Sequence, residues 1–160
     1  MAKDPKPVAL EAAQAPLQPP RVGYPEPFRA VLAGRQKRPL GDLFGLTDFG
    51  VNLTRLAPGA ASALRHYHTR QDEFVYVLAG HPLLVTDAGE TPLAPGMCAG
   101  FKAGSANGHC LVNRTARDVL YLELGDRSAG DEVDYPDVDM RLVAAPAGGR
   151  RYVHRNGKPY

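Results

Sequence analysis

Residues 59–80 read GAASALRHYHTRQDEFVYVLAG, and this stretch decides the fold. Two β-like runs, 63–68 and 73–78, flank a short polar turn at 69–72. Residues i and i+2 of a strand project from the same face, so the imidazoles of His66 and His68 are expected side by side. Two imidazoles on one face can bind one metal ion, although a single His-x-His pair is weak support for a metal site.

Glu73 strengthens this interpretation because it opens the apolar run FVYVL. A carboxylate in a strand that is buried on both faces costs several kcal/mol unless it is paired or bound to metal. The polar turn could return Glu73 on the neighbouring strand beside the two histidines. The alternative places Glu73 at an exposed strand start, bonded to water or to an arginine.

A second informative stretch is residues 96–113, GMCAGFKAGSANGHCLVN. His109 follows a glycine-rich turn there and opens another β-like run. Taken alone, such a histidine is more often a hydrogen-bonded structural residue. Taken with the first stretch, it completes a set of three imidazoles and one carboxylate.

Short β-like runs separated by Gly and Pro continue on both sides of these stretches. Close, regular spacing of this kind is typical of an all-β sandwich or barrel. The remaining expected strands span residues 50–56, 82–86, 97–101, 109–113 and 119–124, with 151–155 as a further candidate.

The two stretches resemble the two motifs of the cupin superfamily. The first motif is matched by Gly59, His66, His68, Glu73 and Gly80, with six residues instead of five after the first glycine. The second is matched by Gly96, Gly104, His109 and Asn113, with Lys102 where proline is usual and a turn before His109 that is two residues longer.

This resemblance implies a double-stranded β-helix, the jelly-roll barrel of cupins, with His66, His68, Glu73 and His109 as the ligands of one divalent metal. Nitrogen and oxygen donors without thiolate suit Mn, Fe, Ni, Co or Zn. The chain also resembles small bacterial single-domain cupins, some of which are labelled sugar-phosphate isomerases.

Three functions stay open at this point. An isomerase or lyase would use the metal as a Lewis acid on a small oxygen-rich metabolite such as a sugar phosphate. A non-haem iron dioxygenase would bind substrate and oxygen at the metal. A sensor or binding cupin would capture a small molecule without catalysis.

Tyr121 and Glu123 are candidates for the acid and base of an enzyme, because they share one face of the 119–124 strand. They can act as acid and base only if this polar face lines the interior of the barrel. The alternative, a polar outer face over a leucine-lined barrel, is equally compatible with the sequence.

The sequence divides into three parts. Seven of the fifteen prolines fall in the first 27 residues, so residues 1–22 are expected to form a flexible arm. Residues 23–127 carry the barrel, with its motifs at 59–80 and 96–113. Residues 128–160, acidic and then basic, are expected to form an extension packed on the barrel or on a partner subunit.

Net charge and composition limit the kinds of partner that the chain is expected to bind. A net charge of +2 gives no reason to expect nucleic acid or a membrane surface. Two cysteines and no recognisable secretion signal indicate a cytoplasmic protein. Phe74, Tyr76 and Leu78 should point outward although they are apolar, so a homodimer that binds a small molecule is expected.

Overall fold

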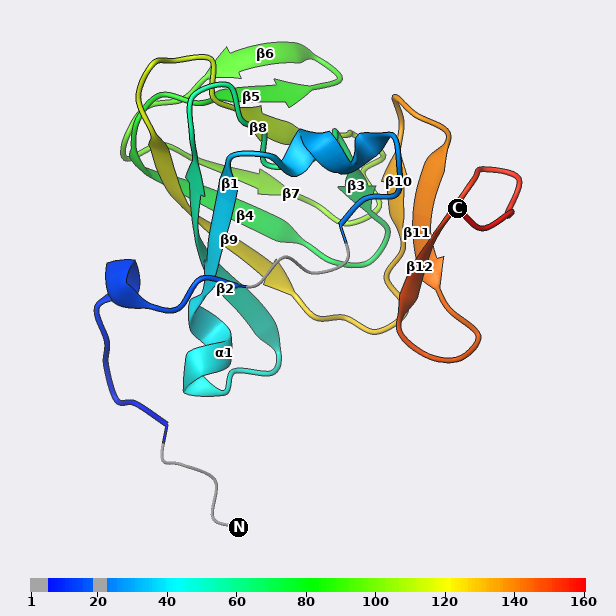
Figure 1. Cartoon of the computed structure of the whole chain (residues 1–160), viewed down its shortest axis with the longest axis horizontal. Helices are drawn as coiled ribbons and strands as arrows, with labels where there is room; N and C mark the ends of the chain where they lie inside the picture. The colour runs from blue at the N-terminus through cyan, green and yellow to red at the C-terminus, as the bar shows by residue number, and fades with distance from the viewer. Residues whose placement is uncertain (1–5, 19–22) are drawn as a thin grey trace.

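The structure is a computed structural model that describes residues 6–18 and 23–160 (Figure 1). The strands are β1 (Arg35–Pro39), β2 (Phe49–Leu56), β3 (Tyr67–His68), β4 (Glu73–Ala79), β5 (Leu83–Thr86), β6 (Gly89–Pro92), β7 (Cys98–Phe101), β8 (Cys110–Val112), β9 (Val119–Asp126), β10 (Val133–Tyr135), β11 (Met140–Ala144) and β12 (Arg150–Val153). The helices are the short α1 (Leu40–Phe44) and the 3₁₀ turns η1 (Ala12–Gln14) and η2 (Phe28–Leu32). No helix within the described residues is long and apolar enough to cross a membrane.

Three antiparallel sheets build the molecule. One wall of the barrel is the five-stranded sheet β1-β2-β9-β4-β7, and a three-stranded sheet β6-β5-β8 forms a second layer. The third sheet, β12-β11-β10-β3, joins the end of the chain to the strand that carries His68. The predicted all-β jelly roll is confirmed.

Strand β4 has one face in the core of the barrel and the other face exposed. Val75 and Val77 are 7% and 0% exposed, whereas Phe74, Tyr76 and Leu78 between and beside them are 39–41% exposed. The period-two alternation therefore sends the valines into the core and leaves three large apolar side chains on the outer face.

Gly80 ends β4 at a place where only glycine fits. Its φ is +79°, and a Cβ added there would lie 2.5 Å from the carbonyl oxygen of Asp118. The left-handed conformation and this close approach give a physical reason for the glycine that closes the first motif.

The extension, residues 128–160, forms three strands of the folded structure. Strands β10, β11 and β12 lie together at one end of the barrel in Figure 1. They bury Val133, Tyr135 and Met140 in a second apolar cluster with Tyr24, and the side chains of η2 pack against it. The rings of Tyr24 and Tyr135 meet edge to face with centroids 5.5 Å apart. Residues near the two ends of the chain thus share one core.

The expected arm lies partly outside the described residues, at 1–5 and 19–22. The rest of it contacts β1: the backbone N–H of Gln18 donates to the Lys37 carbonyl at 2.8 Å, and Arg38 donates to the Ala15 carbonyl. Strands β1, β6, β10 and β11 are not among the sequence predictions. The predicted strand at 63–68 is shorter in the structure, because only residues 67 and 68 form a strand there.

Candidate metal centre

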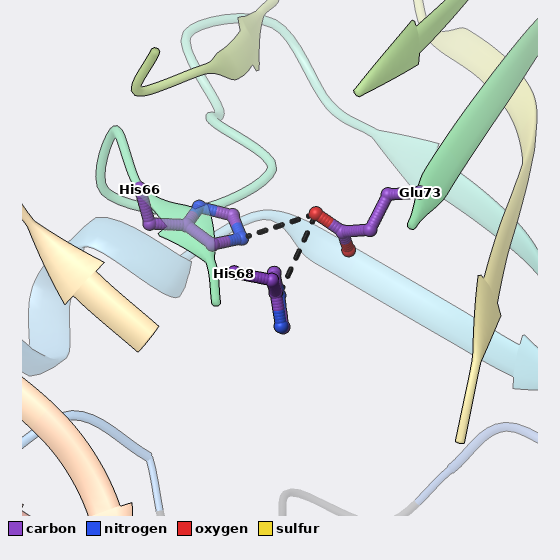
Figure 2. A group of neighbouring side chains, drawn as sticks. All are labelled: His66, His68 and Glu73. Atoms are coloured by element: carbon purple, nitrogen blue, oxygen red, sulfur yellow. Dashed lines mark ion pairs between the residues drawn. The ribbon is translucent and has the colours of Figure 1, made fainter. Parts of the chain in front are cut away.

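His66, His68 and Glu73 converge on one point. Figure 2 shows both rings and the carboxylate pointing toward one another, with His68 in β3, His66 just before this strand and Glu73 at the start of β4. The Nε2 atoms of His66 and His68 lie 3.7 Å and 3.5 Å from Glu73 Oε2. One donor atom from each of the three residues lies within 4.8 Å of the others.

His109 reaches the same oxygen in spite of its longer turn. Its Nε2 lies 3.0 Å from Glu73 Oε2. Two backbone hydrogen bonds tie His109 to His66, at 2.9 Å and 3.1 Å, and its ring stacks flat on Phe101 with centroids 3.5 Å apart. The structure therefore brings together all four residues that the motifs indicate.

The Nδ1 atoms of two histidines are already engaged. His66 Nδ1 lies 2.9 Å from the Leu64 carbonyl oxygen, which can only accept a hydrogen bond, so the ring proton sits on Nδ1. His68 Nδ1 lies 2.6 Å from Asp131 Oδ2. With the protons held at Nδ1, the Nε2 lone pairs face the centre of the cluster, as metal ligation requires.

The spacing of the donors fits a metal ion. Donors bound at about 2.1 Å lie about 3.0 Å apart at right angles and about 3.4 Å apart in a tetrahedron. The three distances from Glu73 Oε2, 3.0, 3.5 and 3.7 Å, fall near this range. Within the described part of the chain, this buried oxygen has no hydrogen-bond partner of good geometry, so the exposed-start alternative for Glu73 does not hold.

The electrostatics favour a neutral imidazole and an ionised carboxylate, the forms that bind metal. Burial lowers the pKa of His66 to about 4. Burial alone would raise the pKa of Glu73, but the contact with His109 and the neighbouring His66 and His68 outweigh it and hold the pKa at about 2. At neutral pH both side chains are therefore in the protonation state that binds a divalent cation.

Asp131 is the residue of the centre that sequence reasoning missed. Its side chain is 2% exposed, and its Oδ2 accepts from His68 Nδ1 at 2.6 Å and from Arg150 at 2.5 Å. Its Oδ1 accepts from the backbone N–H groups of Arg70 and Gln71 at 2.9 Å and 3.3 Å. Burial alone would raise the pKa of Asp131, but these hydrogen bonds hold it below its usual value.

The four residues line a cavity of about 980 Å³. Tyr121 and Glu123 line it as well, so the polar face of β9 points inward and the alternative of a leucine-lined interior is wrong. The Tyr121 hydroxyl donates to Glu123 Oε2 at 3.4 Å, and Lys37 forms an ion pair with the same carboxylate. Burial and the charge of Glu123 raise the pKa of Tyr121 well above 10.

The other titratable residues near the motifs lie away from the cavity. Arg65 makes ion pairs with Asp87 and Asp137, and exposed Lys102 pairs with Asp72. His81 is exposed and Cys110 is buried, as the sequence predicts. The remaining histidine, His154 in the extension, bonds to Asp139 and stacks on Tyr160.

Comparison with known proteins agrees with this picture. Residues 52–125 match the family model of the cupin domain. A crystal structure from Silicibacter pomeroyi DSS-3, described as a sugar phosphate isomerase from a cupin superfamily, is 43% identical over 95% of this chain and 96% of that one, with a TM-score of 0.88. No curated protein sequence matches.

Two further solved structures are similar. A protein from Acidithiobacillus ferrooxidans, provisionally named a sugar phosphate isomerase, is 32% identical over 79% of this chain and 80% of that one, with a TM-score of 0.71. A polyketide cyclase from Streptomyces resistomycificus shares the fold at 19% identity, over 79% of this chain and 80% of that one, with a TM-score of 0.61. From the barrel, the two motifs and these similarities, the chain belongs to the cupin superfamily.

Proposed function

We propose that the chain is a metal-dependent isomerase or lyase that acts on a small oxygen-rich metabolite such as a sugar phosphate. The ligands of its one divalent ion are His66, His68, Glu73 and His109. The observation that carries this proposal is the approach of three imidazole Nε2 atoms to one buried carboxylate oxygen inside a cavity.

The donor set of three imidazoles and one carboxylate suits Mn, Fe, Ni, Co or Zn. Such an ion supplies a Lewis acid that polarises a carbonyl or hydroxyl oxygen of the substrate. Apolar side chains that line the cavity, among them Phe101 and Val75, lower the local polarity and strengthen this electrostatic effect.

Proton transfer is assigned to the inward face of β9. An aldose–ketose isomerisation moves one proton between adjacent carbons and one between their oxygens, so no external oxidant or reductant is needed. Glu123 would carry the carbon-bound proton. Tyr121, held protonated by its raised pKa, donates a hydrogen bond that orients the Glu123 carboxylate.

Two solved structures support the choice of substrate class. The proteins from Silicibacter pomeroyi and Acidithiobacillus ferrooxidans, both more than 30% identical, carry sugar phosphate isomerase names. This similarity extends over more than three quarters of the chain in each case.

The metal assignment is tested by metal content. His66→Ala should lower bound metal after equilibration with Mn²⁺ or Zn²⁺ at least about 10-fold, because it removes a ligand. His154→Ala is the matched control, since His154 bonds to Asp139 away from the cavity. Equal metal content and affinity in wild type and His66→Ala would overturn the ligand assignment.

The reaction is tested on Glu123. Glu123→Gln should lower kcat on an active sugar phosphate about 100-fold or more while metal affinity stays unchanged. Unchanged kcat would remove Glu123 from the proton transfer. Oxygen uptake by the iron form with catechols, diketones or thiols would instead identify an iron dioxygenase.

One observation favours a non-catalytic binding or sensor role as the second candidate. Lys37 pairs with Glu123, which places a positive charge on the only carboxylate besides Glu73 among the described cavity residues. If this pair persists with ligand bound, the carboxylate is less available as a base. Tight binding of a sugar phosphate without any turnover would support this role.

We also propose a homodimer in the cytoplasm. The outer face of β4 exposes Phe74, Tyr76 and Leu78, and Met97 nearby is 43% exposed, so a second copy would remove this apolar surface from water. The two cysteines are free, in agreement with a reducing compartment. Sedimentation of a monomer at micromolar concentration would contradict the dimer, and Tyr76→Glu should dissociate it.

A further inference from the structure

Three cations line the cavity, and two of them are engaged. Lys37 pairs with Glu123 inside it. Arg29 pairs with Glu26 at 3.3 Å, and both side chains are 68% exposed, so this pair lies at the rim. The third cation is Arg35 at the start of β1.

Arg35 makes no ion pair with any carboxylate of residues 6–18 and 23–160. Its Nη1 donates to the carbonyl oxygen of Ser62 at 2.5 Å, a neutral partner in the loop that leads to His66. A guanidinium has five N–H donors in a planar fork, so this bond fixes the side chain and leaves most donors free. Among residues 6–18 and 23–160, Arg35 is thus a positioned cation whose charge no carboxylate pairs with.

Arg35 and the tyrosines near it line the cavity. Burial raises the pKa of the phenols of Tyr24, Tyr121 and Tyr152, and the positive charge of Arg35 offsets part of this rise at each of them. All three tyrosines line the same cavity as the metal centre. Phenol hydroxyls and a guanidinium fork together offer hydrogen bonds to a multi-oxygen anion.

The charge balance indicates which anion. A divalent ion with Glu73 and Arg35 would leave about +2 in the cavity, since the Lys37–Glu123 and Arg29–Glu26 pairs cancel and imidazoles that ligate a metal are neutral. A phosphate monoester carries about −1.5 to −2 at pH 7. A single carboxylate would compensate only half of the charge.

We propose that Arg35 is the anion-binding group of the cavity, and that the ligand is a phosphate monoester whose sugar end reaches the cluster of His66, His68, Glu73 and His109. This inference rests on the proposed function and assigns the part of the site that selects the substrate class.

The test is calorimetric titration of inorganic phosphate and of glycerol phosphate into the metal-loaded protein. Arg35→Met should weaken binding of both about 10- to 100-fold, since it removes charge-assisted hydrogen bonds. Arg35→Lys keeps the charge without the fork and should fall between wild type and Arg35→Met. Arg55→Met is the control, because Arg55 pairs with Asp118 at the surface and does not line the cavity.

Each outcome decides the inference. Equal phosphate affinity in wild type and Arg35→Met overturns it, as does an equal loss in Arg55→Met. If Arg35→Met does not fold, Arg35→Lys decides, and an unchanged affinity there overturns the assignment of the fork. Failure of the proposed function is seen separately, as binding of a sugar phosphate without any turnover, or as unchanged metal affinity in His66→Ala.

Discussion

Replacing Asp131 by Asn should weaken metal binding although Asp131 is not one of the four expected ligands. The carboxylate accepts four hydrogen bonds and donates none: Oδ2 faces His68 and Arg150, and Oδ1 faces two backbone N–H groups. Asparagine has the same shape, but its amide nitrogen can only donate. One of the two pairs of donors must therefore face another donor.

Either orientation of the asparagine disturbs His68. If the amide nitrogen faces His68 Nδ1, the ring proton moves to Nε2, and the lone pair directed at the metal is lost. If the oxygen faces His68, the amide nitrogen meets the backbone N–H groups of the turn before Glu73, and the bond to His68 loses its charge. Loss of such a partner typically costs 10- to 100-fold in metal affinity, or about 1.4 to 2.8 kcal/mol.

The assay is competition with a chelator for Zn²⁺ or Mn²⁺, combined with the melting temperature of the metal-free protein. Asp139→Asn is a matched control, because Asp139 also accepts from a histidine Nδ1, that of His154 at 2.9 Å, and from a backbone N–H. Neither residue of the control pair lines the cavity, so metal affinity should not change. Wild-type affinity in a folded Asp131→Asn protein would refute the positioning role of Asp131.

Three further predictions concern the rest of the chain. A thiol reagent should modify exposed Cys98 in the native protein and spare buried Cys110, whose pKa burial raises to about 11; two fast-reacting thiols would contradict this. Asn113→Ala should lower the free energy of unfolding by about 2–4 kcal/mol in urea denaturation. The fully buried amide donates to the backbone carbonyls of Arg117 at 2.8 Å and Leu56 at 3.0 Å, and both would lose their partner. A loss below about 0.5 kcal/mol would contradict this role of the amide. The metal-free protein should lose stability as the pH falls from about 6.5 toward 4. In the unfolded chain His66 takes a proton near pH 6.5, whereas burial lowers its pKa in the folded protein to about 4. A melting temperature that stays constant over this range would argue against that burial.

The parts of the site that could be predicted from the sequence are those set by local spacing. His66 and His68 share a face because they are two residues apart, and Glu73 follows after a turn too short to lead far away. The inward face of β9 could not be decided, because alternating leucines and polar residues suit a barrel wall in either orientation. Only the register with β2 and β4, which sets Tyr121 opposite Thr54 and Val77, fixes it.

Residues that join the site through pairing of distant strands left no local signal. Asp131 lies in an acidic stretch that looks like solvated surface, and its burial depends on β10 pairing with β3, about 65 residues earlier. The same holds for Arg35 and Lys37, because β1 consists of four charged or amide side chains and a proline and has no β-like composition. Charged residues enter this barrel through register, which a single sequence does not encode locally.

The extension and the metal centre therefore form one physical unit. Strand β3 pairs with β10, so the backbone that carries His68 is held by the extension as well as by the barrel. Tyr135 of β10 stacks on the ring of His66 with centroids 5.8 Å apart, and Asp131 bonds to His68. A barrel cut at residue 127 would keep all four motif residues and lose these three supports. Its metal affinity should fall further than that of Asp131→Asn alone, because the orientation of two histidines depends on residues that the cupin motifs do not contain.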